Sequence, residues 1–139
     1  MLFTSFSSHP YVDPTGTYTL DGKTQKKGDD IYGYFGEILV KKLSDQKILM
    51  AFDICKGAPS YNSGSFLDTL DYTGAVAIYK ADPDLDPTCQ IKFEFTSKGI
   101  TVSEETEELG FGCGFGYSVI ADGFFKKISS AEPDIKDKF

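Results

Sequence analysis

Residues 89–102 read CQIKFEFTSKGITV, and this stretch decides the fold class of the chain. Ile91, Phe93 and Phe95 alternate with polar residues, which predicts a strand with one apolar face and one solvated face. The turn signal at 97–99 then leads into a second alternating run, ITV. Two strands joined by so short a turn pair antiparallel, so the stretch predicts a β-hairpin.

A second stretch extends this hairpin. Residues 113–127 read CGFGYSVIADGFFKK and predict a long final strand over 114–127. Together with the hairpin, this strand forms an antiparallel meander. Cys89 and Cys113 stand at the entrances of its first and last strands, where a disulfide is able to staple the unit.

The same rhythm runs through the earlier part of the chain. Turn signals recur at intervals of roughly 8–12 residues, which is the spacing of all-β proteins. Gly33 and Gly36 predict a bulge or sharp bend, a device that barrels use to close. Short connections favour an up-and-down order, so about eight strands are expected to form a small antiparallel barrel. The further strand candidates are 16–20, 31–43, 48–55, 66–72 and 75–79, with the last two expected to form a hairpin through Thr73-Gly74.

Length and composition are those of one folded domain. The chain has 139 residues, of which 40% are hydrophobic, including twelve Phe and eight Tyr, and this argues against disorder. We expect an irregular N-terminal arm at 1–14, a barrel domain at 15–128 and a polar C-terminal tail at 129–139. No stretch is apolar enough over the length that a membrane-spanning helix requires.

The net charge of −7 narrows the classes of partner. It argues against nucleic acid and against an anionic membrane surface, because both require a basic face. It suits a cationic protein partner, which an acidic surface attracts. The alternative is that the charge only keeps the protein soluble.

Three cysteines allow at most one intrachain disulfide. We favour Cys89–Cys113, because both residues precede strands that are expected to lie side by side; Cys55 is then free. The alternative is three reduced, buried thiols in a cytosolic protein. The first ten residues lack the basic and apolar regions of a signal peptide. The expected compartment is the periplasm or envelope if a signal was removed ahead of them, and the cytoplasm otherwise.

Catalytic, metal and cofactor motifs are weak. Residues 82–86 read DPDLD, like the opening of a calcium loop, but the Gly and Glu of an EF-hand are replaced by Pro87 and Phe93. His9 is the one histidine, so zinc ligation and a histidine-dependent catalytic triad are not expected. The glycines at 112–116 (GCGFG) precede an expected strand rather than a helix, which argues against a phosphate loop. We therefore predict no catalytic residue and no cofactor, and expect Phe115 to plug the barrel end.

Two segments are candidates for partner binding. One is a loop whose Tyr, Ser and Asn side chains suit recognition on a rigid scaffold; it comprises Ser60, Tyr61, Asn62 and Ser63. The other is an acidic lip for a basic partner, formed by Glu104, Glu105, Glu107 and Glu108. The alternatives are an ordinary turn, a solvated acidic face, or a pair of carboxylates in a small hydrolytic enzyme.

The pattern C-x-I-x-F-x-F followed by C-G-F-G-x-x-V-x-A-D-G-x-F-x-K resembles that of small bacterial envelope proteins. Their layout is similar to that of the bacterial lysozyme inhibitors, which are small, often lipocalin-like antiparallel barrels. The resemblance implies a protein without enzymatic activity that occludes a basic hydrolase, or an immunity protein that blocks a toxin. Such inhibitors insert a loop into the enzyme cleft, a role that Ser60, Tyr61, Ser63 and Gly64 match here. The alternative function is a lipocalin-like carrier of a small apolar ligand inside the barrel.

Overall fold

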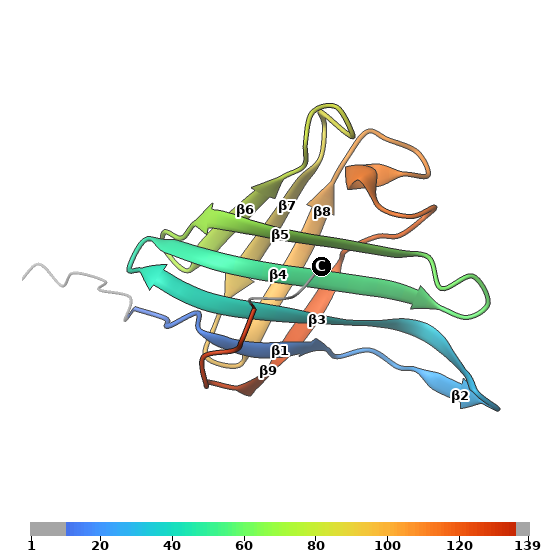
Figure 1. Ribbon diagram of the computed structural model, residues 1–139, viewed down its shortest axis with the longest axis horizontal. Helices are drawn as coiled ribbons and strands as arrows, with labels where there is room; N and C mark the ends of the chain where they lie inside the picture. Colours follow the sequence, from blue (N-terminus) through green and yellow to red (C-terminus); the bar gives the residue numbers. More distant parts are fainter. Residues whose placement is uncertain (1–10, 136–139) are drawn as a thin grey trace, which may run out of the picture.

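A computed structural model describes residues 11–135, which form one antiparallel sheet curled into a nearly closed barrel (Figure 1). This confirms the predicted fold class. The strands are β1 Gly16–Leu20, β2 Gln25–Lys27, β3 Asp30–Ser44, β4 Lys47–Gly57, β5 Ser63–Asp71, β6 Val76–Lys80, β7 Gln90–Phe95, β8 Gly99–Glu105 and β9 Gly123–Ser129. A short 3-10 turn, η1 Gly112–Gly114, lies between β8 and β9.

The strand order is β5-β4-β3-β1-β9-β8-β7-β6, with the short β2 paired to β3. Apart from β2, neighbours in the sheet are neighbours along the chain, except where β1 pairs with β9. That ladder joins the first and last strands, as an up-and-down barrel requires. The two edges of the sheet are β5 and β6, so the barrel has one open seam.

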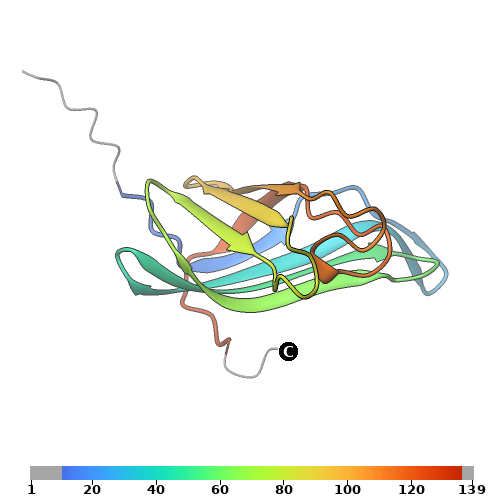
Figure 2. The same ribbon diagram turned by 90° about the horizontal axis from the view of Figure 1, so that it is seen from above.

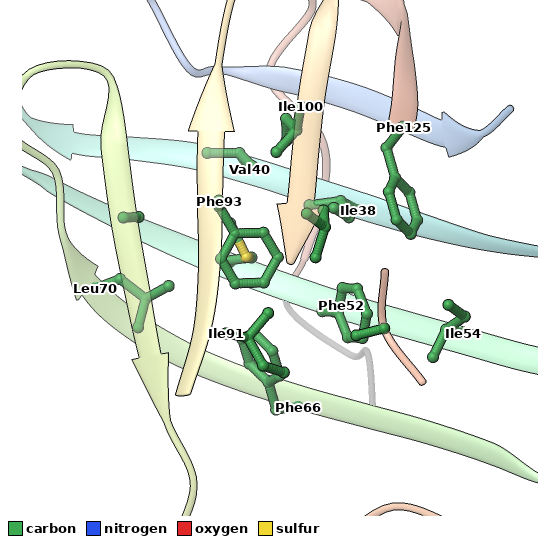
Figure 3. Close-up of a cluster of buried hydrophobic side chains, with 14 of the residues drawn as sticks. Ile38, Val40, Phe52, Ile54, Phe66, Leu70, Ile91, Phe93, Ile100 and Phe125 are labelled. Atoms are coloured by element: carbon green, nitrogen blue, oxygen red, sulfur yellow. The ribbon is translucent and has the colours of Figure 1, made fainter. Parts of the chain in front are cut away.

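The alternation of apolar residues determines which side of the sheet faces inward. Ile48, Met50, Phe52 and Ile54 of β4 are all fully buried. They meet the inward side chains of β7 and β8 across the barrel (Figure 3). Buried aromatic and aliphatic side chains therefore occupy the barrel interior.

The expected hairpin between 66–72 and 75–79 is wrong in its pairing. Only an isolated bridge, Thr73 to Val76, joins the two segments. β5 pairs with β4 along its whole length and β6 pairs with β7, so the two strands diverge from their connection (Figure 2). Side chains close the seam between β5 and β6 instead, because the rings of Phe66 and Tyr79 stack with their centroids 3.7 Å apart.

The expected long strand over 114–127 is also wrong. β9 begins at Gly123, and the preceding residues form η1 and an irregular loop. Cys113 and Ser118 have φ of 60° and 58°, a left-handed conformation that is uncommon for residues other than glycine and that interrupts a strand. The apolar residues of this segment fold over the barrel end instead of alternating along an edge.

The predicted bend near Gly33 is confirmed. The β3–β4 register shifts between Tyr32 and Phe35, and Gly33 has φ of +97°. A Cβ at this position would lie 2.6 Å from the Lys23 carbonyl oxygen, so both the backbone conformation and the close approach require glycine.

The outer face of the sheet carries a small second cluster. Ile135, in the expected polar tail, is buried against Leu39 and Ala51. These two residues alternate with core residues of β3 and β4, so their side chains point away from the barrel interior. Within residues 11–135, no helix has the length and apolar character needed to cross a membrane.

Candidate protein-binding surface at the disulfide end

Three loops meet at one end of the barrel: 58–62 after β4, 81–89 after β6 and 106–122 after β8 (Figure 1). Cys89 and Cys113 form a disulfide there, with Cα atoms 5.0 Å apart, so the predicted pairing is confirmed. We call this end of the barrel the disulfide end. Cys55 on β4 is the free thiol and is partly buried.

Asp86 is the polar centre of the disulfide end. Its carboxylate is fully buried and accepts hydrogen bonds from the Cys113 amide (2.7 Å), the Thr106 hydroxyl, and the amide and hydroxyl of Thr88 (2.9 and 2.7 Å). Burial raises the pKa of this carboxyl, but the hydrogen bonds from Thr106, Cys113 and Thr88 outweigh it and hold the pKa well below its usual range. The Asp86 carboxylate thus connects the 81–89 loop and the 106–122 loop next to the disulfide.

This arrangement also explains the DPDLD segment. One ligand atom each of Asp86, Cys89 and Cys113 lie within 4.8 Å of one another, as in a metal site. The two sulfur atoms are bonded to each other, and the carboxylate oxygens already accept protein hydrogen bonds. The cluster therefore acts as a structural junction.

Phe115 is the plug that the sequence predicts. It is buried and its ring stacks on Phe52 with centroids 6.1 Å apart. A Cβ at Gly64 would lie 2.2 Å from Cγ of Phe115. The Gly116 amide donates to the Ser63 carbonyl at 2.8 Å, which attaches the loop to the exposed edge of β5. The glycine-rich segment thus has the structural role expected of it.

The predicted recognition loop is held rigidly. The Tyr61 hydroxyl donates to Asp30 Oδ1 at 2.9 Å and accepts from the Ile31 amide at 3.1 Å. Asn62 Nδ2 donates to the Tyr117 carbonyl at 3.2 Å. Ser60 and Ser63 are exposed. A partner can therefore reach the Tyr61 ring and the serine hydroxyls, whereas the Tyr61 hydroxyl is already engaged.

The acidic run divides into two parts. Glu105, Glu107 and Glu108 are exposed. Glu104 is half-buried; its Oε1 accepts from the Ala121 amide at 3.0 Å, and burial raises the pKa of its carboxyl. Glu104 therefore holds the loop, and the other three carboxylates face solvent.

Apolar side chains at this end were missed by the sequence analysis. Leu109 is 95% exposed, Phe111 57% and Tyr117 58%. The rings of Phe111 and Tyr117 contact each other edge to face, with centroids 5.5 Å apart. The expected long strand over 114–127 hid Tyr117, whereas Leu109 and Phe111 precede that strand, and the leucine directly after Glu107-Glu108 was an available signal. We call Leu109, Phe111 and Tyr117, with Glu105, Glu107 and Glu108, the loop surface.

The two segments predicted from the sequence therefore lie at one end and are linked through Tyr117 and Asn62. Glu104, the glutamate with the raised pKa, lines neither of the cavities described below. His9 lies outside the described residues. Comparison of the chain with protein-family models, curated proteins and solved structures gives no match.

Proposed function

We propose that this protein is a binding protein without enzymatic activity, which uses the loop surface to occlude a cationic hydrolase or toxin. The observation that carries the proposal is the exposure of Leu109, Phe111 and Tyr117 on a loop held by a disulfide and a buried carboxylate. Large apolar side chains concentrated on a rigid loop are typical of interaction sites.

Rigidity favours binding by such a loop. Cys113 is held through its disulfide and through its amide, and Tyr117 is held through its carbonyl. Ordering a mobile loop costs free energy when a complex forms, and a preorganised loop avoids most of that cost. Aromatic anchors at the centre of an interface contribute most of the binding free energy.

The three exposed glutamates favour a basic partner. All three come shortly before Leu109 in the chain, so the apolar anchor has carboxylates next to it. Carboxylates around an apolar centre form a polar rim, and a protein of charge −7 attracts a cationic surface over long distances. A basic hydrolase or toxin is therefore the class of partner that the charge favours, and it is the class that the sequence resemblance implies.

A direct test uses two basic probes, a lysozyme and a ribonuclease, together with a pull-down from cell lysate. Binding is measured by biolayer interferometry at low and at physiological salt, and inhibition by the activity of each probe enzyme. The test variant is Leu109→Ser with Phe111→Ser. The control is Leu67→Ser, an exposed leucine on the barrel wall at β5.

We expect the wild type and the control to bind and inhibit a basic partner, with weaker binding at higher salt. The double variant should lose at least about tenfold in affinity, as expected when a central anchor is removed. Failure of the wild type to retain any protein contradicts the proposal, and so does equal binding by the double variant.

A further inference from the structure

A cavity of 1020 Å³ lies at the opposite end of the barrel. It is formed by residues 11–13, the β3–β4 and β7–β8 turns, the connection between β5 and β6, and the end of β9. Its volume lies just above the usual range for small-molecule sites, roughly 300–1,000 Å³, and barrel mouths are a common location for such sites. We call it the mouth cavity.

One wall of the mouth cavity is aromatic. Tyr72 and Phe95 contact each other with ring centroids 5.2 Å apart, and Tyr11 contacts Tyr72 at 6.0 Å. The Tyr72 hydroxyl donates to the Val12 carbonyl at 2.6 Å, and the Tyr11 hydroxyl donates to the Asp45 carbonyl at 3.3 Å. Tyr72 and Phe95 are buried behind this wall, so the ring surface open to a ligand is that of Tyr11, which is 50% exposed.

The other side of the mouth cavity is cationic. Lys127 lines it and also lines an adjoining cavity of 570 Å³, to which Lys98 and Lys126 contribute. Within residues 11–135, none of these three lysines forms an ion pair. Lys127 is partly buried, and its ammonium donates to the Asp13 carbonyl at 3.4 Å. Three lysines at the two adjoining cavities concentrate positive charge in a chain of net charge −7, and they provide a site for an anion.

The carboxylates near the two cavities neutralise this cationic side only in part, because three lysines face Asp13 and Asp21. Asp45 pairs with Lys42 at 3.0 Å, and Asp13 accepts from the Thr15 amide at 3.0 Å. Asp45 lies against Tyr11, whereas Asp13 lies next to Lys127, whose charge contributes to lowering the pKa of the Asp13 carboxyl. Asp21 is exposed in the adjoining cavity. A negatively charged group is therefore favoured at the lysines and disfavoured beside Tyr11.

We infer that the mouth cavity binds an anionic amphiphile, a molecule with one apolar chain or ring system and one carboxylate head. The apolar part contacts the exposed ring of Tyr11 and the partly exposed Val12 and Ala75, and the carboxylate pairs with Lys127. Side chains fill the barrel interior, so this site differs from the interior position expected for a carrier's ligand. It is also independent of the loop surface, which lies at the other end of the barrel.

The test uses decanoate as the probe, with decanol and decyltrimethylammonium as neutral and cationic counterparts. Affinities are measured by isothermal titration calorimetry, and the site by chemical-shift changes in the amide NMR spectrum. Lys127→Gln removes the charge that faces the ligand. Ser97→Trp places a large side chain at a position shared by both cavities. Lys80→Gln is the matched control, because Lys80 is exposed on β6 and lines neither cavity.

We expect decanoate to bind the wild type and Lys80→Gln equally, with shifts at Thr96 and Ala75. Lys127→Gln should bind decanoate about tenfold more weakly while its affinity for decanol is unchanged. Ser97→Trp should bind neither, with an unchanged circular dichroism spectrum. The inference is overturned if decanoate does not bind the wild type, if the cationic amphiphile binds as well, or if Lys127→Gln binds decanoate normally.

Discussion

Gly64 lies directly against the ring of Phe115, and this contact connects the seam of the barrel to the loop surface. A Cβ at position 64 would lie 2.2 Å from Cγ of Phe115 and 2.5 Å from Cδ1. The ring stacks on Phe52 in the core. Because Phe115 is two residues from Cys113 and from Tyr117, a displaced ring moves the loop that carries the exposed apolar residues.

Gly64→Ala should therefore destabilise the protein and weaken partner binding together. Overpacking a core contact costs about 1–3 kcal/mol, which chemical denaturation measures as a lower midpoint. Phe115→Val in the Gly64→Ala background should recover part of the loss, because the smaller side chain makes room for the methyl group. Gly22→Ala is the control, since its added methyl would approach no atom closer than 3.3 Å. A Gly64→Ala protein as stable as the wild type would contradict the packing described here.

Asp86→Asn should lower stability at neutral pH. Each hydrogen bond to a charged group contributes about 1.5–3 kcal/mol, and an amide cannot accept all the hydrogen bonds that this carboxylate accepts. The carboxyl is more acidic in the folded than in the unfolded chain, so its ionisation stabilises the fold above the ordinary pKa of 3.8. That stabilisation is lost as the pH falls through the ordinary pKa and then through the lower folded pKa.

The pH dependence separates this effect from a general loss of packing. Denaturation of the wild type and Asp86→Asn is compared from pH 7 down to pH 2. We expect the difference between them to be largest at neutral pH and to shrink below about pH 4, as protonation of the wild-type carboxyl begins. A difference that stays constant with pH would show that the charge is not responsible.

The disulfide should hold the loop surface without being required for the barrel. Cys89 and Cys113 are separated by 24 residues, and closing a loop of that length contributes about 3 kcal/mol. Cys89→Ser with Cys113→Ser should therefore lower the free energy of unfolding by this order and weaken partner binding. The far-ultraviolet circular dichroism of a β-sheet should persist.

Thiol labelling checks the pairing directly. Iodoacetamide under denaturing, non-reducing conditions should modify Cys55 alone, and prior reduction should make all three cysteines reactive. Labelling of three thiols without reduction would show that the protein is isolated in its reduced form. Equal partner binding by the oxidised and reduced proteins would contradict the role given to the disulfide.

Tyr61→Phe should distinguish the ring of Tyr61 from its hydroxyl. The hydroxyl joins the recognition loop to Asp30 and Ile31, so its removal should cost about 1 kcal/mol of stability. The partly exposed ring remains, and partner binding should change less than twofold. Tyr61→Ala with Ser63→Ala removes the ring as well and should weaken binding more. Equal binding by this pair and the wild type would exclude the 58–62 loop from the interface.

The alternation of apolar and polar residues was sufficient to predict most strands of the sheet. Ile48, Met50, Phe52 and Ile54 alternate with more exposed positions, and all four prove fully buried. The period of a strand is two residues, so each such run identifies both the element and its inward face. The pairing of Cys89 with Cys113 also followed from the sequence, although Cys113 lies in a 3-10 turn and not ahead of a strand.

The failures occur where contacts between distant residues override the local pattern. The run from Gly114 to Ala121 is apolar enough for a strand, but Phe115 is buried against Phe52 and Gly64. Its backbone bends through left-handed conformations at Cys113 and Ser118 to reach that position. No periodicity within the segment records such a contact.

Sequence alone determined an acidic, all-β chain with an up-and-down barrel, because charge and a two-residue period are properties of neighbouring residues. Only the tertiary structure decided that β5 and β6 leave a seam, that Phe115 fills the adjoining barrel end, and that Leu109, Phe111 and Tyr117 remain exposed. It alone placed Lys127 in the same cavity as Tyr11, with Lys98 and Lys126 in the adjoining cavity. These features depend on which strands meet across the barrel, and that is set by packing between residues far apart in the chain.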